Sequence, residues 1–139
     1  MADYDNKARR AIAMLEKAGL RATAQRVLLV SLLYGNGEHR HVTAEQLYEE
    51  AFSARGKVSL ATVYNTMRAL CKVGLLRQVT ADAARIYFDT NTRDHHHIYD
   101  ESTGKLTDID AAVLEGITLP PLPAGAQLEG VDLIVRVRS

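Results

Sequence analysis

The sequence contains one cysteine, Cys71, and no tryptophan, and its three prolines are confined to residues 120–123. A single cysteine excludes an internal disulfide and any zinc site built from Cys-x-x-Cys pairs. No apolar run approaches the ~20 residues of a membrane span, and no signal peptide is recognisable. These absences predict a protein of the reducing cytoplasm that has no membrane-spanning segment.

Charge is unevenly distributed along the 139 residues, although the formal net charge is zero. Residues 1–88 carry 13 Lys and Arg against 8 Asp and Glu, whereas residues 89–139 carry 4 against 9. The change of sign coincides with a change from helical to strand periodicity. We therefore predict two domains, a basic nucleic-acid-binding module over 1–88 and an acidic module over 89–139 that attracts cations.

The basic half has the start and stop signals of four helices. The apolar pattern predicts helices over residues 3–18 and 24–34, and Thr43-x-x-Gln46 has the form of a capping box that opens a third helix. A fourth helix is expected between Ser59, which can cap its N-terminus, and Gly74, which can end it. Two extended segments, 75–80 and 85–89, follow as a hairpin. Helices followed by a hairpin predict a winged helix, a DNA-binding variant of the helix-turn-helix.

The fourth helix has two contrasting faces. Its apolar arc, which we expect to face a core, comprises Leu60, Val63, Met67, Leu70 and Cys71. The opposite arc comprises Ala61, Thr62, Asn65, Arg68 and Lys72, with Tyr64 at its border. Because this arc offers hydroxyl, amide and cationic groups and no acid, it suits a polyanion, and we interpret it as a DNA recognition surface. Phosphate contacts are expected from Arg21, Arg26, Arg77 and Arg85.

The acidic half is expected to be a small sheet. Its patterning predicts strands over 97–99, 106–109 and 128–137, with a short helix over 111–115. A three-stranded unit of about 50 residues has too small a core to be stable by itself. We therefore expect it to pair with the same unit of a second chain, in a homodimer or a higher oligomer.

The segment Asp94-His95-His96-His97 is the clearest candidate for metal chemistry. In a strand, His95 and His97 project from one face and His96 from the other. Alternate residues lie ~7 Å apart along the backbone, close enough for two imidazoles to bind one ion. Imidazoles with carboxylates suit Zn²⁺, Mn²⁺ or Fe²⁺. Further ligands are available at Asp89, at Asp108 and, in the loop before the third helix, at His41. The alternative is a solvated histidine run at a turn.

Five motifs occur in order along the chain: LRATAQR (20–26), HVTAE (41–45), SLATVY (59–64), DHHH (94–97) and GKLTD (104–108). With these motifs the sequence resembles the ferric uptake regulator (Fur) family over essentially its whole length. The resemblance implies an α+β homodimer with an N-terminal winged helix and a C-terminal α/β dimerisation domain. It also implies that Tyr64 contacts bases in the major groove of double-stranded DNA and that Arg21 approaches an A·T-rich minor groove. The predicted DNA-binding residues are then Arg21, Arg26, Ser59, Thr62, Tyr64, Asn65 and Arg68.

The resemblance also implies a regulatory metal site. The family's ligands for Mn, Fe or Zn fall on His41, Asp89, His95, His97 and Asp108. The family's structural zinc site, built from four cysteines, cannot form, since Asp100-Glu101-Ser102-Thr103 stands at its first cysteine pair and no later cysteine exists. The triple histidine and the missing cysteines resemble the iron-response regulator (Irr) branch, whose members respond to haem. Candidate haem ligands are His95, His96 and His97. Metal and haem compete for the same residues, and the sequence does not decide between them.

The function implied is that of an iron- or haem-responsive transcriptional regulator, not an enzyme. It binds operator DNA as a dimer, controls iron-homeostasis genes and is released by haem. The alternative within the family is a regulator co-repressed by Mn²⁺, Zn²⁺ or Fe²⁺, or one that senses peroxide. A metal-dependent hydrolase would need a general base and an open coordination position, and no such base stands out beside the histidines. A haem-binding or metal-storage module without a DNA role is a further alternative.

Overall fold

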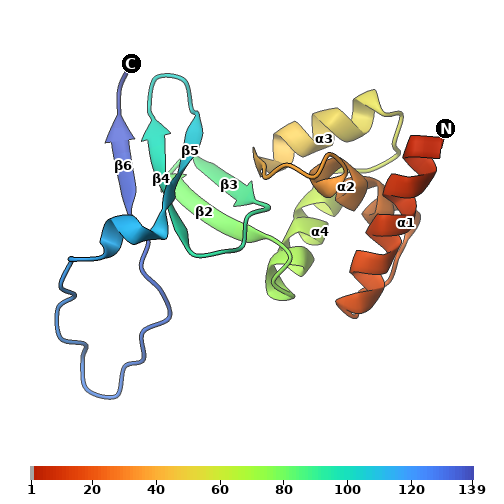
Figure 1. Ribbon diagram of the computed structural model, residues 1–139. Coiled ribbons are helices and arrows are strands. Elements are labelled where there is room, and N and C mark those ends of the chain that lie inside the picture. The colour runs from red at the N-terminus through yellow and green to blue at the C-terminus, as the bar shows by residue number, and fades with distance from the viewer. Residues whose placement is uncertain (1) are drawn as a thin grey trace. The chain divides into compact units, whose positions relative to one another are not determined.

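The computed structural model describes residues 2–139, and the chain divides into two compact units that meet between Thr92 and Arg93. The N-terminal unit contains helices α1 to α4 and strands β1 to β3, and the C-terminal unit contains strands β4 to β6 with a short 3₁₀ helix (Figure 1). Helices thus dominate the first unit and strands the second. Among the described helices, none combines the length and the apolar character that a membrane crossing requires.

Side-chain caps determine where three of the helices in the N-terminal unit begin. The helices are α1 (Ala2–Lys17), α2 (Ala24–Tyr34), α3 (Ala44–Ser53) and α4 (Leu60–Lys72). The hydroxyls of Thr23, Thr43 and Ser59 accept hydrogen bonds from backbone N–H groups in the first turns of α2, α3 and α4. The Gln46 side chain accepts in return from the Thr43 N–H, which completes the capping box. These predicted helix starts are confirmed.

The core of the N-terminal unit draws apolar side chains from every helix and from β1 and β3. Helix α4 contributes Val63, Met67 and Leu70, which are fully buried as predicted. Leu60 is 37% exposed, so the prediction that it faces the core is wrong. It is the first residue of α4, and a side chain at a helix end lacks the neighbours that a further turn would supply. The core therefore begins one turn into the helix.

A three-stranded sheet completes the N-terminal unit. Its strands are β1 (His41–Val42), β2 (Arg77–Asp82) and β3 (Arg85–Asp89), in the order β1-β3-β2 with antiparallel pairing throughout. The hairpin predicted after α4 is therefore present, although its first strand starts at residue 77 and extends to residue 82. The pairing of β2 with β3 shifts register between Thr80 and Asp82, which is typical of a β-bulge.

The C-terminal unit is built on β4. Strand β4 (His95–Asp100) lies between β5 (Leu106–Asp110), which is antiparallel to it, and β6 (Ile134–Val137), which is parallel. The 3₁₀ helix η1 covers Ala111–Leu114, where a short helix was predicted. The predicted strand over 128–137 is wrong in its first half, because β4 offers pairing partners only to residues 134–137. Tyr99 and Leu106 are this unit's buried apolar side chains among the described residues.

Candidate metal centre and DNA-binding surface

His41 and Asp89 form a pair on neighbouring strands of the N-terminal unit. They lie opposite each other in the antiparallel pairing of β1 with β3, and His41 Nε2 is 3.1 Å from Asp89 Oδ2. Asp89 is fully buried, and its second oxygen, Oδ1, accepts a hydrogen bond from the Asn91 N–H. Such partners are needed because removing a carboxylate from water is costly. His41 was predicted in a loop. Its place in a strand instead fixes it opposite Asp89.

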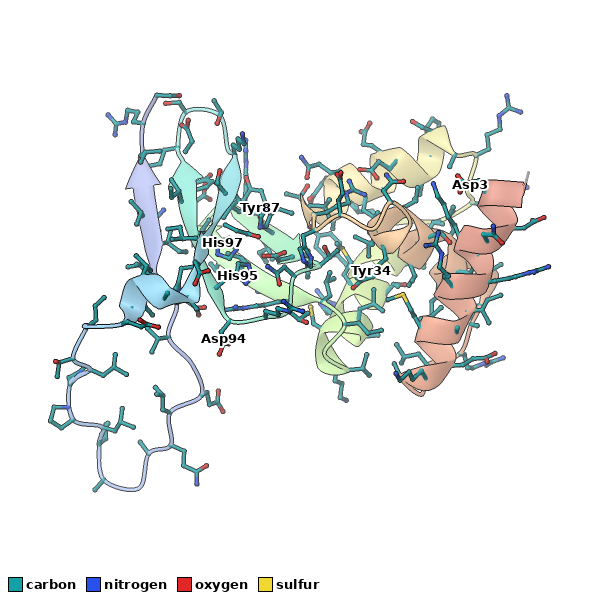
Figure 2. The ribbon with its side chains drawn as sticks, in the orientation of Figure 1. Asp3, Tyr34, Tyr87, Asp94, His95 and His97 are labelled. Carbon is teal, nitrogen blue, oxygen red and sulfur yellow. The ribbon has the colours of Figure 1, made fainter. Side chains whose placement is uncertain are left out.

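His95, His97 and Asp108 form a second group, within the C-terminal unit. His97 lies opposite Asp108 in the pairing of β4 with β5, and His95 projects from the same face of β4. The Nε2 atoms of His95 and His97 are 3.4 and 3.5 Å from the same atom, Asp108 Oδ1. The two imidazole rings lie edge to face with centroids 4.6 Å apart (Figure 2). Two nitrogens and one oxygen from three residues thus converge on one point.

The spacing of this second group fits a metal ion. With metal–ligand bonds of about 2.1 Å, neighbouring ligand atoms of a tetrahedral or octahedral site are about 3.0–3.4 Å apart. The His95 Nε2-to-Oδ1 distance of 3.4 Å lies at the upper limit of this range, and the His97 Nε2-to-Oδ1 distance of 3.5 Å lies just above it. The His41–Asp89 distance of 3.1 Å lies within it. Imidazole with carboxylate is a borderline donor set that suits Zn²⁺, Fe²⁺ and Mn²⁺.

His96 does not belong to either group. It projects from the opposite face of β4, where its Nδ1 atom accepts a hydrogen bond from the Leu133 N–H at 3.0 Å. The backbone N–H of His97 donates to the carbonyl oxygen of the same residue, Leu133, at 3.1 Å. The imidazole of His96 therefore helps to fix the chain just before β6. The three predicted haem ligands therefore do not lie on one face of β4. A single haem could contact either His96 on one face or His95 and His97 on the other.

Helix α4 presents the predicted DNA-binding side chains on its exposed side. Thr62, Asn65 and Arg68 follow the Ser59 cap along this side, and the Arg68 guanidinium lies 5.9 Å from the centroid of the Tyr64 ring. The Tyr64 hydroxyl donates a 2.6 Å hydrogen bond to Glu45 Oε1 of α3. This hydrogen bond is the main reason why the pKa of Tyr64 is raised.

The contact of Tyr64 with Glu45 is not predictable from the spacing of residues within α4. The arc of α4 itself has no acid, but Glu45, in the first turn of α3, brings a carboxylate to it. The sequence gives little signal for this, because residues 45 and 64 belong to different helices and their approach depends on how α3 packs against α4. The face is therefore cationic with one acid at its edge.

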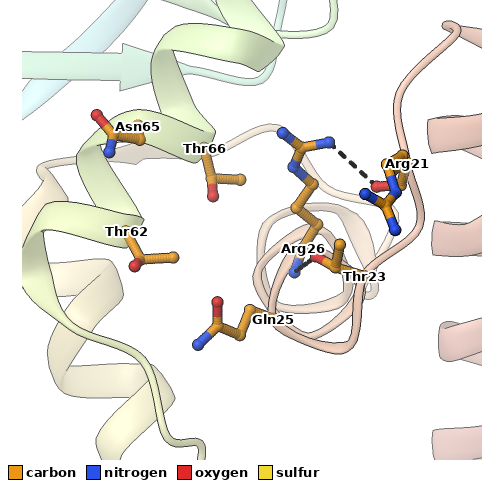
Figure 3. Close-up of a pocket in the computed structure, with 7 residues that line it drawn as sticks. All are labelled: Arg21, Thr23, Gln25, Arg26, Thr62, Asn65 and Thr66. Atoms are coloured by element: carbon orange, nitrogen blue, oxygen red, sulfur yellow. Dashed lines mark hydrogen bonds between the residues drawn. The ribbon is translucent and has the colours of Figure 1, made fainter.

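Arg21 and Arg26 lie on the α2 side of the same surface. Together with Thr23, Gln25, Thr62, Asn65 and Thr66 they line a pocket of about 280 Å³ between the start of α2 and α4 (Figure 3). One guanidinium nitrogen of Arg26 donates to the backbone oxygen of Arg21 at 3.2 Å. The predicted residues Arg21, Arg26, Thr62 and Asn65 thus line a single pocket, whereas Tyr64 and Arg68 are not among its lining residues.

The turn between β4 and β5, where the family's first cysteine pair would stand, is held by polar contacts. Glu101 forms ion pairs with Arg138 at 3.7 Å and with Arg136 at 4.0 Å. The Ser102 hydroxyl donates to the backbone oxygen of Ser139 at 3.1 Å. Charged and hydroxyl groups therefore tie this turn to residues 136–139 at a place where no sulfur ligand exists.

Comparison with known proteins shows the family. The model of the ferric uptake regulator family matches residues 17–135, and the chain belongs to this family. The peroxide-responsive repressor PerR of Staphylococcus epidermidis is 33% identical over 113 residues, which cover 81% of this chain and 74% of the repressor. The corresponding repressor of Staphylococcus aureus strain Mu50 is 34% identical over 106 residues, covering 76% and 70% of the two chains.

Solved structures agree with this assignment. The ferric uptake regulator of Pseudomonas aeruginosa with manganese superposes with a TM-score of 0.70 at 28% identity, covering 93% of this chain and 97% of that one. The regulator from Vibrio cholerae gives a TM-score of 0.73 at 20% identity, covering 92% and 98%. The predicted fold class and family are confirmed, and members of this family are regulators, not enzymes. None of these relatives is an iron-response regulator, so assignment to that branch stays a prediction.

Proposed function

We propose that the protein is a metal-dependent transcriptional regulator that binds operator DNA as a dimer. In this proposal residues 1–88 bind DNA, and residues 89–139 dimerise and sense the effector. The observation that carries it is the pair of ligand groups, His41 with Asp89 in one unit and His95 with His97 and Asp108 in the other. Each group has metal-ligand spacing within its own unit. The five residues together are the ones onto which the family's regulatory site maps.

The connection between the two ligand groups is short. Only five residues separate Asp89 from His95. An extended chain spans at most ~3.5 Å per residue, so these two ligands lie within about 20 Å of each other in any arrangement of the units. In this proposal His41, Asp89, His95, His97 and Asp108 would together hold one divalent cation, whose bonds to both groups would restrict the angle between the units. Two of the ligand residues have fixed positions. Asp89 accepts a hydrogen bond from the Asn91 N–H, and the pairing of β1 with β3 fixes His41 opposite Asp89.

The DNA contacts proposed follow from the exposed side of α4. A recognition helix in the major groove contacts bases with its exposed side chains, here Tyr64 and Arg68. Basic residues of the hairpin, Arg77 and Arg85, are expected to contact phosphates. Dimerisation is supported by the C-terminal unit, which leaves many apolar side chains exposed: Val113, Ile117, Leu119, Leu122, Leu128, Val135 and Val137. A second copy is the partner that would cover them.

A gel-shift experiment tests the proposal. A DNA duplex is selected from a random pool in two parallel selections, one with Mn²⁺ and one with chelator, and its affinity is then measured with chelator, Mn²⁺, Fe²⁺, Fe²⁺ plus peroxide, and haem. We expect Mn²⁺ and Fe²⁺ to increase affinity at least tenfold over chelator, and we expect affinity to fall as salt is raised, because phosphate contacts release counterions. Equal affinity with chelator and with Mn²⁺ would contradict the metal dependence.

A peroxide response is a second candidate function. It is favoured by the relatives named above, which are peroxide-responsive repressors that are 33% and 34% identical to this chain over 113 and 106 aligned residues. A ferrous ion would supply the electron that activates peroxide beside the imidazoles. We then expect peroxide to abolish binding of the Fe²⁺ form only, with one oxygen atom added at His41, His95 or His97. His39 and His96 serve as internal controls, because one is exposed and the other faces away.

The haem response predicted from the sequence is tested in the same experiment. Haem is expected to release the protein from DNA, whereas the metal-activated and peroxide-sensing alternatives predict no effect of haem. His96 projects from the face of β4 on which it accepts a hydrogen bond from the Leu133 N–H, and His95 and His97 project from the opposite face. A haem ligand would therefore come either from His96 or from His95 and His97. Substitution of His96 by alanine separates these two sources.

Replacing Glu45 with glutamine is expected to tighten DNA binding several-fold. The Glu45 carboxylate accepts from the Tyr64 hydroxyl at the edge of the proposed DNA surface, where its charge repels phosphates. Glutamine keeps an acceptor for Tyr64 and removes the charge, a change worth about 1 kcal/mol for a neighbouring phosphate in water. Glu49→Gln on the same helix is the matched control, since Glu49 is exposed and is not the residue that accepts from Tyr64. Equal affinities of the two variants would contradict this role.

A further inference from the structure

Helices α1, α2 and α3 meet around a pocket of about 440 Å³ in the N-terminal unit, here called the three-helix pocket. Its lining residues come from these helices, which lie together in Figure 1, and from the segments that follow α2 and α3. None of them is among the predicted DNA-binding or metal-binding residues. Small-molecule sites in proteins are typically clefts of about 300–1,000 Å³ that combine apolar walls with a few polar groups. The volume of the three-helix pocket falls within this range.

Part of the lining is apolar. Leu28 and Leu32, which are one helical turn apart on α2, line the pocket and pack against the core of the unit. Leu28 also fills the space beside Gly56, where a Cβ atom would lie only 2.2 Å from Leu28 Cδ2. Ala54 and the exposed ring of Tyr4 add further apolar surface. Because packing fixes the two leucines, this surface can receive an apolar ligand without first being ordered.

Lys7 brings an ammonium group to the pocket. Its stem lies against Gly35, where a Cβ atom would be 3.0 Å from Lys7 Cδ. Its Nζ donates to Asn36 Oδ1 at 3.2 Å and is 3.3 Å from Asp3 Oδ2. The Asp3 side chain is 79% exposed, and an ion pair of this kind is weak in water. An ammonium group has three donors and an asparagine amide has two, so both side chains can also donate to a ligand.

Arg40 is a second cation of the lining, and its position is fixed. Its Nη1 donates to the Leu32 backbone oxygen at 2.8 Å and to Glu50 Oε1 at 2.9 Å, and its Nη2 donates to Glu50 Oε2 at 2.6 Å. Its backbone N–H donates to the Thr90 hydroxyl at 2.8 Å. The Glu50 carboxylate therefore balances the charge of Arg40. Lys7, Arg40 and Glu50 together give the lining one net positive charge.

We propose that the three-helix pocket binds a small monocarboxylate with an apolar body of one or two rings. A single negative charge matches the net charge of the lining, whereas a second one would be repelled by Glu50. The carboxylate is bound by Lys7 and Asn36, and the apolar body lies on Leu28 and Leu32. With ~30 Å³ for each water-sized group, a volume of about 440 Å³ is far larger than a carboxylate alone requires. This ligand goes beyond the proposed function, because its binding needs neither metal nor DNA.

A titration with 2-naphthoate tests the proposal. The full chain is kept in chelator, since carboxylates also bind metal ions, and binding is followed by the amide NMR signals of residues 28–36. We expect saturation below about 5 mM, which is in keeping with the affinity of small ligands. The uncharged 2-naphthamide has nearly the same shape and should bind about tenfold more weakly. Acetate, which has a carboxylate and no ring, should give no saturable shift in this range.

Lys7→Met tests the position of the carboxylate. Methionine keeps an unbranched stem beside Gly35 and removes the charge. We expect 2-naphthoate to bind about tenfold more weakly and the preference for carboxylate over amide to disappear, since such non-additivity identifies two groups in contact. Lys17→Met is the matched control, because Lys17 is an exposed residue of the same helix outside the pocket, and it should keep the preference. Neither substitution should change the melting temperature, as for most surface substitutions.

Ala54→Phe tests the position of the apolar body. Ala54 is exposed and lines the pocket just after α3, so a larger side chain there occupies ligand space without entering the core. We expect 2-naphthoate and 2-naphthamide both to lose binding at an unchanged melting temperature. Absence of saturation by 2-naphthoate, equal affinity for the amide, or unchanged binding in both Lys7→Met and Ala54→Phe would overturn the proposal. These titrations contain neither metal nor DNA, so their failure leaves the proposed function standing, and failure of the gel shift leaves this pocket standing.

Discussion

Replacing His97 with alanine is expected to abolish metal-dependent DNA binding. His97 Nε2 lies 3.5 Å from Asp108 Oδ1, and His95 Nε2 lies 3.4 Å from the same oxygen, so removal of one imidazole leaves an incomplete ligand group. Loss of residues that merely support a metal ligand already costs roughly 10–100-fold in affinity, and loss of a ligand should exceed this. We expect Mn²⁺ affinity to fall more than about a hundredfold, measured by competition with a fluorescent chelator.

His39→Ala is the matched control for this experiment. His39 is exposed and belongs to neither ligand group, so the substitution should leave Mn²⁺ affinity and DNA binding unchanged. The His97→Ala variant should keep the helical circular dichroism signal, since α1 to α4 lie in the other unit, and the His39→Ala variant should keep it because His39 is exposed. A His97→Ala protein that binds Mn²⁺ within threefold of the unmodified protein would show that the histidines on β4 are not the regulatory ligands.

Local chemistry explains why the helices were predictable. Thr23, Thr43 and Ser59 each satisfy a free N–H group of the first helical turn, and this interaction involves residues only three positions apart. Gly74 adopts φ +80°, a backbone conformation that glycine reaches without steric cost, and it follows the last turn of α4. Signals of this kind do not depend on how the helices pack, so the sequence alone sufficed.

The C-terminal strand was predicted too long because its extent depends on a distant partner. Alternation over residues 128–137 indicated a strand, but only residues 134–137 pair in strand register with β4, about 37 positions earlier in the chain. The preceding residues 120–123 include three prolines, which cannot donate to a ladder. Nothing local to residues 128–133 distinguishes them from the paired ones.

The candidate site also combines features that follow from local sequence with contacts that depend on distant elements. The alternation of β4 predicts that His95 and His97 share a face, and this is how the strand presents them. The pairing of His41 with Asp89 depends on β1, a two-residue strand too short to be seen in the sequence pattern. The Tyr64 contact with Glu45 likewise requires two helices to be packed before it exists. Contacts between elements were therefore the part that the sequence could not supply.

Leu70→Ala is expected to destabilise the N-terminal unit strongly. Leu70 is fully buried, at 0% exposure, in the core between α4 and the other helices. Truncation of a buried leucine costs about 2–5 kcal/mol, because apolar contacts are lost and a cavity remains. A domain of this size is stable by only about 5–15 kcal/mol, so the variant should unfold at a much lower urea concentration. Helical circular dichroism reports this unit, since α1 to α4 all lie within it.

Leu60→Ala on the same helix separates burial from residue type. Leu60 was predicted to face the core by the same periodicity as Leu70, but it is 37% exposed at the first position of α4. Alanine has a slightly higher helix propensity than leucine, and the exposed side chain has fewer contacts to lose. We expect a cost below about 1 kcal/mol, as for most surface substitutions. If Leu60→Ala were as damaging as Leu70→Ala, the start of α4 would pack more deeply than described, and the Ser59 cap beside the pocket would belong to the core.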